Sequence, residues 1–421
     1  MPRSLHLFLL AFALACPAPA VAQDRAQALF EAAKVKVVKI GVVLNATRSQ
    51  TSVGSGFLVS SDGLVVSNFH VVSEFLRRPE QYTIEYTRHD GSRGPLQLIN
   101  VDVVHDLALL RMEGSGLPHF SLLEREMAKG ERGFSIGNPH DLGLTIVEGT
   151  YNGTITESLY EHIHFTGAIN PGMSGGPALA REGAVFGVNV ARLVDAQLVS
   201  FLVPARFVAA LIADARDEAA TPQALLERAR DQIVNAQDLH LGRLLDAELP
   251  QAGLGAYRVA DRLGPFMRCW GRADGEPNRP YRTNQQNCSS EASIFVFDDV
   301  RTGSIDFEHV LLESRGLGWL RFYKLYESRF GYAGGLPGRE EDFTEFRCTT
   351  DFVRQDDLTL RTALCVRAYK RLAGLYDFWL RAASLNAYDR GLQTTLVLTG
   401  VSWENGTRFA RHYLETIGGT P

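Results

Sequence analysis

A serine enclosed by glycines stands at the centre of the stretch INPGMSGGPAL, residues 169–179. Glycine adopts backbone conformations that other residues avoid, so a turn of this kind can direct several backbone N–H groups at one point. A serine hydroxyl becomes a nucleophile when a neighbouring base removes its proton. The reaction also needs an acid that orients the base and donors that bind the developing oxyanion. Ser174 is therefore a candidate nucleophile, and its partners must lie elsewhere in the chain.

A histidine and an aspartate with suitable surroundings precede this serine. His70 follows the apolar run in VVSNFHVV, and we expect it at the end of a strand. Asp106 opens the apolar strand expected in DVVHDLALLRM. The order is histidine, aspartate, serine, with separations of 106 − 70 = 36 and 174 − 106 = 68 residues. Taken singly, the three have structural explanations as a packed histidine, a cap residue and a tight turn. Together they favour a catalytic triad.

The phrases around these residues resemble those of the chymotrypsin-fold serine proteases, and among them the HtrA-like (DegP-like) branch. GSGFLVSSDGLVVSNFHVV, DLALL and NPGMSGGP carry the resemblance, which covers about residues 30–216. It implies that His70 is the general base, that Asp106 orients its imidazole, and that the N–H groups of Gly172 and Ser174 form the oxyanion hole. Met173 departs from the pattern, which usually has asparagine there, and we expect this to affect substrate fit more than chemistry.

The resemblance also indicates where the specificity pocket lies. Its floor is expected near two residues and its wall near four more: Ala168 and Ile169, then Asn189, Val190, Ala191 and Arg192. None of these is acidic, so a trypsin-like demand for lysine or arginine is not expected. A shallow apolar pocket favours small or aliphatic residues before the cut. Arg192 would instead favour acidic neighbours or narrow the entrance, and the sequence leaves the order of these effects open.

Composition restricts the partners. The chain has 421 residues with 43 lysines and arginines against 48 aspartates and glutamates, a net charge of −5. This balance argues against nucleic acid or an anionic membrane surface as partner, and we expect protein or peptide substrates. His162 and His164 alternate along one expected strand but lack evident carboxylate partners, so a packed or solvated strand face is preferred to a metal site. We expect neither metal nor cofactor, and the oligomeric state stays open.

The first 22 residues have the features of a signal peptide. Arg3 precedes the apolar run LHLFLLAFALA, which is too short to span a membrane, and the small residues 20–22 precede Gln23 as a cleavage site. We therefore expect export to the periplasm or out of the cell, with a lipid anchor on Cys16 as the less favoured alternative. No later segment is long and apolar enough for a spanning helix.

The four remaining cysteines predict disulfides in an oxidising compartment. Cys348 and Cys365 lie symmetrically about the polar turn RQDD (348 + 365 = 713, centre 356.5), so they should face each other across a hairpin. Cys269 and Cys288 are then left as the second pair. Unpaired thiols are less favoured, and so is zinc, because no Cys-x-x-Cys pattern occurs.

The elements that would position these residues are mainly β-strands. We expect a helix over 24–34, short strands from residue 35, and a helix after Pro204. Further on, SIFVFDD, SIDFEHVLLES, WLRFYKLYES and TTLVLTGVSW are expected as strands, and FARHYLETI as a closing helix. The predicted fold is a double β-barrel chymotrypsin-like protease domain over 23–217, a helical linker over 218–252 and a disulfide-stapled β-rich domain over 253–421. A PDZ domain is not favoured, because only GLG of its pattern is present.

The sequence thus predicts an exported serine endopeptidase that hydrolyses peptide bonds through an acyl-enzyme on Ser174 and prefers small or aliphatic residues before the cut. The alternative is a non-catalytic or autoinhibited protein on a protease fold, with a binding or chaperone-like role and control by the C-terminal domain. The intact triad and oxyanion glycines argue against the non-catalytic form, since a decayed enzyme usually loses one of them.

Overall fold

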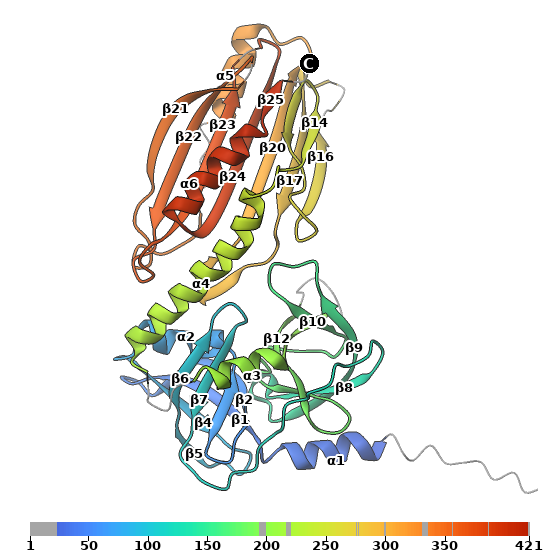
Figure 1. Ribbon diagram of the computed structural model, residues 1–421, viewed down its shortest axis with the longest axis vertical. Helices are drawn as coiled ribbons and strands as arrows, with labels where there is room; N and C mark the ends of the chain where they lie inside the picture. The colour runs from blue at the N-terminus through green and yellow to red at the C-terminus, as the bar shows by residue number, and fades with distance from the viewer. Residues whose placement is uncertain are drawn as a thin grey trace, which may run out of the picture.

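The computed structural model describes residues 23–192, 199–215, 220–274, 276, 278–298, 300–330, 336–355, 357–385 and 387–419. The described chain forms two lobes stacked along the long axis, with the N-terminal lobe below and the C-terminal lobe above (Figure 1). The mainly β fold predicted from the sequence is confirmed, while the expected signal peptide lies outside the described residues.

The first half of the lower lobe is a seven-stranded antiparallel sheet with the order β5-β4-β1-β2-β3-β7-β6. Its strands are β1 Val37–Leu44, β2 Ser49–Leu58, β3 Leu64–Ser67, β4 Tyr82–Thr87, β5 Arg93–Pro95, β6 Gln97–Asp102 and β7 Leu107–Arg111. Helix α2, Phe69–Arg77, connects β3 to β4. Fully buried aliphatic side chains such as Ile40, Val65 and Leu110 join sheet and helix in one core.

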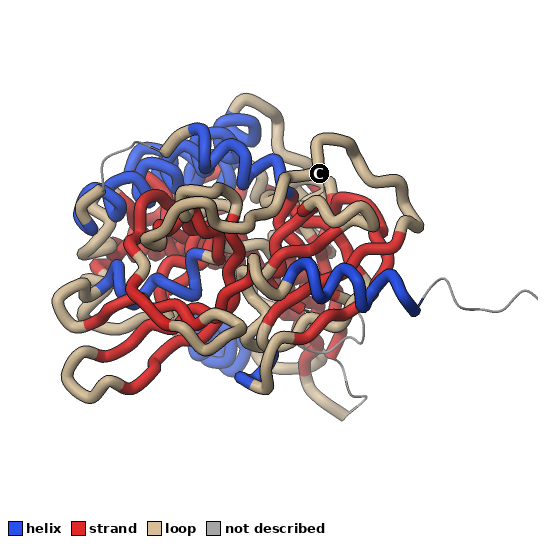
Figure 2. The backbone as a smooth tube through the Cα atoms, turned by 90° about the horizontal axis from the view of Figure 1, so that it is seen from below, coloured by secondary structure: helices blue, strands red, loops and turns tan. Residues whose placement is uncertain are grey.

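The second half of the lower lobe is a closed barrel with the order β10-β13-β12-β11-β8-β9. Its strands are β8 Arg132–Gly137, β9 Thr145–Ile155, β10 His162–Phe165, β11 Pro177–Leu179, β12 Val185–Arg192 and β13 Ser200–Pro204. Helix α1, Gln23–Ala33, lies on the outside of this barrel (Figure 2), and its Leu29 shares a hydrophobic cluster with Phe134 and Val185. Helix α3, Ala205–Ala213, begins directly after Pro204, as predicted. The seven-stranded sheet and the closed barrel together have the barrel-like arrangement of the chymotrypsin fold.

The upper lobe is built on a second seven-stranded antiparallel sheet, ordered β16-β17-β20-β24-β23-β22-β21. Its strands are β16 Arg268–Asp274, β17 Tyr281–Ser289, β20 Ile305–Ser314, β21 Arg347–Gln355, β22 Leu358–Ala368, β23 Leu375–Ser384 and β24 Arg390–Ser402. Helix α6, Trp403–Glu415, lies across one face (Figure 1). A small sheet of β14 Gln251–Leu254, β15 Tyr257–Ala260 and β25 Gly418–Gly419 completes the lobe.

Both predicted disulfides are present, one at each edge of this sheet. Cys269–Cys288 joins β16 to β17, and Cys348–Cys365 joins β21 to β22, with Cα atoms 4.1 and 4.0 Å apart. In each pair the cysteines are directly opposite each other in the strand register. Each disulfide therefore ties an edge strand, which has a neighbour on one side alone, to the next strand of the sheet.

One predicted strand is wrong, because its apolar spacing is helical, and another, TTLVLTGVSW, is confirmed as part of β24 except for its last residue. WLRFYKLYES lies in helix α5, Trp319–Phe330, where Phe322 and Tyr326 are buried four residues apart while Trp319 and Leu320 are exposed. Trp403 opens helix α6 instead of ending a strand, because the Ser402 hydroxyl caps that helix by accepting from the Asn405 N–H.

One of the hydrophobic clusters spans both lobes. Helix α4, Pro222–Leu245, runs from the lower lobe to the upper lobe (Figure 1). The hairpin of β18, Ile294–Phe297, and β19, Val300–Thr302, belongs to the C-terminal part of the chain. Buried side chains of α4 and of this hairpin, including Leu225 and Val296, join the same cluster as Val72 and Leu76 of α2. The contact between the lobes is therefore an interior and not a loose surface.

Candidate active site

His70 is the second residue of helix α2 and not the end of a strand, which corrects the sequence prediction. Asn68 precedes the helix in an extended conformation, and its side chain makes no cap hydrogen bond to the helix. The buried residues Phe69, Val72 and Leu76 then follow a helical period. The short β3 strand ends at Ser67, before His70, so the apolar run continues into helix α2 and not along the strand.

Asp106 takes the place of the missing cap. It precedes β7 with φ 55°, a left-handed conformation that aspartate tolerates better than most residues. Its backbone carbonyl accepts from the Phe69 N–H at 3.1 Å and from Asn68 Nδ2 at 2.8 Å. Its carboxylate Oδ1 accepts from the His70 N–H at 2.8 Å. The first N–H groups of a helix lack partners within the helix and attract negative charge, so this carboxylate stabilises the start of α2.

The same carboxylate orients the imidazole. His70 Nδ1 lies 2.6 Å from Asp106 Oδ2. With the shared proton on Nδ1, the Nε2 atom is left free to accept one, which is the tautomer that a general base requires. Burial disfavours a charged imidazole, but the charge and hydrogen bond of Asp106 outweigh it and raise the pKa of His70 above its ordinary value. The His70 side chain remains 29% exposed.

Ser174 lies in a turn that is pressed against the start of α2. Gly172 and Gly175 have φ values of 94° and 83°, which side chains rarely tolerate. A Cβ atom on Gly175 would come within 2.3 Å of the Ser55 carbonyl oxygen and 2.8 Å of the Asn68 nitrogen. The Ser55 N–H donates to the Ser174 carbonyl at 2.8 Å. The chain thus brings Ser174 beside the residues that lead into His70.

Two N–H groups of this turn are left over. The other three donate to backbone carbonyls: Met173 to Asn170 (3.0 Å), Gly175 to Asn189 (2.8 Å) and Gly176 to Met173 (3.0 Å). Among the described residues, no acceptor pairs with the N–H of Gly172 or of Ser174. The Pro171 carbonyl accepts from the His140 N–H at 2.9 Å. In a trans peptide the N–H and the carbonyl point in opposite directions. Because the Pro171 carbonyl points to the His140 N–H, the Gly172 N–H is directed away from His140. Two free donors side by side are what binding of an oxyanion needs.

The third link of the triad is not formed in this conformation. The Ser174 hydroxyl donates to the Val190 carbonyl at 3.4 Å. Within the described part of the chain no hydrogen bond joins it to His70. Rotation about the Cα–Cβ bond of Ser174 redirects the hydroxyl without moving the backbone, and catalytic hydrogen bonds are often long or misdirected before substrate binds.

The residues expected to form the specificity pocket differ in their exposure and contacts. Ala168 is exposed, whereas Ile169 is only 3% exposed and belongs to the core of the second barrel. Asn189 is fully buried and supports the turn. Its Oδ1 accepts from Ser135 at 2.8 Å, and its Nδ2 donates to the Ile136 and Met173 carbonyls at 3.1 and 3.2 Å. Val190 contributes a backbone carbonyl, and the side chains of Ala191 and Arg192 lie outside the described residues.

Met173 does not face the substrate side, which corrects a further expectation. It is fully buried, and it packs with Phe165 and Ile169 in the barrel core. A Cβ atom on Gly137 would lie 2.9 Å from the Met173 Cβ, so the methionine fills the space that this glycine leaves. Its presence in place of asparagine is therefore a matter of packing.

Two contacts near the site were not foreseen from the sequence. Ser55 Oγ donates to the Gly172 carbonyl at 2.8 Å and accepts from the Asn138 N–H at 3.0 Å, so it braces the oxyanion turn. Ser55 is the serine of the GSGF motif, so the sequence did contain a signal that could have pointed to this contact. Phe295 of β18 places its ring 5.8 Å from the His70 ring, at an interplanar angle of 71°. No local pattern marks Phe295, because the contact joins residues 295 − 70 = 225 positions apart.

Part of the chain is similar to known proteins. Residues 54–188 match the family model for a trypsin-like peptidase domain, and they include His70, Asp106 and Ser174. A probable periplasmic serine endoprotease, DegP-like, of Chlamydia pneumoniae is 38% identical over 144 residues, 33% of this chain and 28% of that protein. Serine protease HTRA1 of Xenopus laevis is 29% identical over 221 residues, 49% of this chain and 46% of that one. The matches thus span less than half of these relatives.

A solved structure, the serine endoprotease from Yersinia pestis, aligns with a TM-score of 0.40 and 23% identity over 45% of this chain and 65% of that one. Among the described residues, no helix is long and apolar enough to cross a membrane. Residues 54–188 of this chain thus match a trypsin-like peptidase domain, and this part of the chain is similar to the HtrA- and DegP-like serine proteases.

Proposed function

We propose that this protein is an exported serine endopeptidase. In the proposed reaction, the Ser174 hydroxyl attacks the carbonyl carbon of a peptide bond while His70 Nε2 takes the hydroxyl proton. Asp106 stabilises the imidazolium that results. The peptide C–N bond then breaks as His70 returns the proton to the leaving amine. A water molecule, deprotonated by the same imidazole, hydrolyses the acyl-enzyme and restores the serine.

The observation that carries the proposal is the pair of free N–H groups at Gly172 and Ser174. Gly172 and Ser174 are partly exposed, and their N–H groups have no acceptor among the described residues, so both donors are available to an acceptor that arrives with a ligand. A tetrahedral oxyanion on the attacked carbonyl supplies that acceptor. The hydrogen bonds of Ser55 and His140 hold the turn in the receptive conformation before substrate binds.

The finer parts of the proposal follow from the sequence. Small or aliphatic residues before the cut suit a pocket whose proposed lining carries no acid. Export agrees with the positive and apolar start of the chain and with the periplasmic placement in the name of the Chlamydia relative. We propose the domain limits 23–217 and 253–421, joined by the helical segment between them, as the functional division of the chain.

An active-site probe tests the proposal on the full chain. A fluorophosphonate should label the wild type at a single serine, and Ser174→Ala should abolish both labelling and peptide hydrolysis. His70→Ala should slow labelling strongly while leaving Ser174 in place. Ser61→Ala, at an exposed serine, is the matched control and should behave as the wild type. Labelling that survives Ser174→Ala, or a wild type that neither labels nor cleaves, would overturn the proposal in favour of a non-catalytic protein.

A further inference from the structure

The β18–β19 hairpin brings the C-terminal part of the chain to the proposed active site. Strand β18 packs against helix α2, which carries His70. Ile294 and Val296 are 2% and 1% exposed and share a core cluster with Val71 and Val72 of that helix. The hairpin is therefore anchored by burial, and its position relative to the imidazole is set by packing and not by a flexible tether.

Phe295 lies between these two anchored residues and stays partly exposed. Its ring stands edge-on to the His70 ring with centroids 5.8 Å apart. Arg301, its partner in the hairpin register, places its guanidinium 5.6 Å from the centre of the same ring. The phenyl group is thus held between a cation on one strand and the imidazole of the other lobe, a geometry favourable to aromatic rings.

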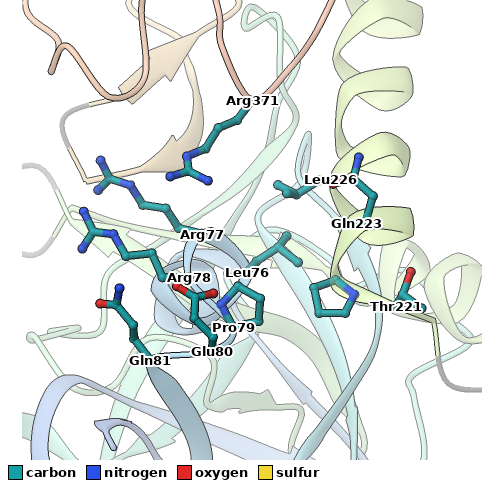
Figure 3. Close-up of a pocket in the computed structure, with 11 residues that line it drawn as sticks. Leu76, Arg77, Arg78, Pro79, Glu80, Gln81, Thr221, Gln223, Leu226 and Arg371 are labelled. Carbon is teal, nitrogen blue, oxygen red and sulfur yellow. The ribbon is translucent and has the colours of Figure 1, made fainter. Parts of the chain in front are cut away.

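A second contact fixes the far end of α2. The Arg77 side chain is fully buried, pairs with Asp342 at 2.7 Å and with Glu341, and lies 5.6 Å from the Phe297 ring centre. Figure 3 shows Arg77 and Arg78 beside Arg371 of the upper lobe, at a cavity of about 510 Å³ that α4 closes on the other side. The C-terminal part of the chain therefore holds α2 near both of its ends.

The hairpin does not seal the site. The His70 side chain is 29% exposed and Ser174 is partly exposed. A peptide that offers its carbonyl to Ser174 and its leaving nitrogen to His70 must pass along the uncovered edge of the imidazole. Because Phe295 is partly exposed and lies against the imidazole, a substrate side chain on that edge would meet its ring. The contact is apolar, because Phe295 presents carbon atoms there.

We propose that Phe295 is a specificity-determining residue that selects peptides with an apolar side chain at the position facing His70. This inference rests on the proposed endopeptidase function and assigns the C-terminal part of the chain a direct share in the substrate cleft. It places one wall of the cleft outside the trypsin-like match, which ends at residue 188. Hydrophobic contacts of this size typically discriminate by a factor of about 10 to 200.

The test compares the full chain with Phe295→Ala, Phe295→Leu and Phe352→Ala. The last removes a phenylalanine that is 65% exposed on edge strand β21 and is the matched control. Active sites are first counted by fluorophosphonate labelling. The ratio of kcat/KM for leucine over glycine is then measured in peptides varied one position at a time, at the three residues on either side of the cut.

At one of these positions, Phe295→Ala should lower the leucine preference by about 10-fold, Phe295→Leu should restore most of it, and Phe352→Ala should not change it. Unchanged preference at every position, with wild-type labelling, would overturn the inference while leaving the endopeptidase intact. An equal rise in kcat/KM for all peptides would also overturn it, because it would make the hairpin an inhibitory plug. Absence of labelling in the wild type would instead refute the endopeptidase itself.

Discussion

Each lobe contains a histidine whose Nδ1 is hydrogen bonded, but the surroundings raise the pKa of one imidazole and lower the pKa of the other. In the lower lobe, Asp106 raises the pKa of His70 although burial works against the charge. In the upper lobe, burial lowers the pKa of His309 to about 4, although the hydrogen bond to the Ala260 carbonyl at 3.0 Å and the charge of Asp261 act in the opposite direction. His309 is fully buried, whereas His70 is partly open to solvent. His70 is a candidate base because a carboxylate is bonded to its ring and solvent reaches its edge, whereas His309 packs in the core.

The lobes also differ in what their polar groups do. In the lower lobe, polar groups near Ser174 hold two backbone donors ready for a ligand. In the upper lobe, the Thr394 hydroxyl is hydrogen bonded to His309 Nδ1 and, at 2.6 Å, to the Tyr413 hydroxyl. These polar groups are buried and bond to one another. The lower lobe carries the proposed catalytic groups, while the upper lobe contributes packing, the placement of α2 and the proposed Phe295 wall of the cleft. Variants in each lobe test this difference.

Asp106→Asn should have the largest effect. The amide keeps the shape of the side chain but favours the wrong tautomer of His70, and the expected loss in kcat is about 10⁴-fold. Peptide hydrolysis under single-turnover conditions measures it. His309→Gln in the upper lobe is the comparison and should leave kcat nearly unchanged per labelled site. Equal losses in the two variants would contradict the distinction between the histidines.

Arg77→Met should have the next largest effect, on stability. It leaves the Asp342 carboxylate, which is nearly buried, without its nearest cation. Burial already raises the pKa of this group against the pull of Arg77. Breaking such a pair costs about 3–5 kcal/mol of unfolding free energy. Denaturant unfolding measures the loss, and labelling of Ser174 should slow as well, because α2 loses its far anchor. Arg48→Met, at a side chain 62% exposed, is the control. A fully stable Arg77→Met protein would show that the lobes do not depend on this contact.

Replacing Cys348 and Cys365 by serine should produce a smaller loss that is confined to stability. The sequence separation is 17, and a loop of that length contributes roughly 3 kcal/mol in the chain-entropy model. Thermal unfolding should shift downward, while the rate of labelling per folded molecule should match the wild type. A large fall in that rate would mean that the edge staple also shapes the site.

The smallest effects concern pH. Catalysis needs neutral His70, so kcat/KM should be lost as the pH falls through a pKa raised above 6.5. The Arg301 charge lowers the pKa of His70 and the Asp298 charge raises it. Arg301→Gln should therefore move the acid limb to higher pH, and Asp298→Asn should move it to lower pH. Shifts of the same sign, or none at either residue, would show that the hairpin charges do not reach the imidazole.

The sequence predicted those parts of the molecule that local patterns encode. Alternating apolar residues predicted most strands, and the symmetry of Cys348 and Cys365 about a turn predicted their pairing. The motifs around His70 and Ser174 pointed to residues that the fold does bring to one place. Helix α5 was missed because a short apolar run was taken for a strand when its buried residues are four apart.

Contacts between distant segments could not be predicted in this way. Phe295 and Arg77 acquire their roles only because the C-terminal part of the chain folds back onto α2, and nothing in the residues around either one records that contact. Met173 shows the same limit on a smaller scale. Its place beside Ser174 suggested a substrate contact, but the direction of its side chain depends on the space left by Gly137.

A crystal structure of the full chain inactivated by a fluorophosphonate would show whether Ser174 and the two free N–H groups act together. We expect phosphorus bonded to Ser174 Oγ and a phosphonyl oxygen roughly 2.7–3.1 Å from the N–H groups of both Gly172 and Ser174. We also expect His70 Nε2 to face Ser174 Oγ, with the Phe295 ring still against the imidazole. An adduct on another residue, or a phosphonyl oxygen turned away from both N–H groups, would rule out the proposed active site.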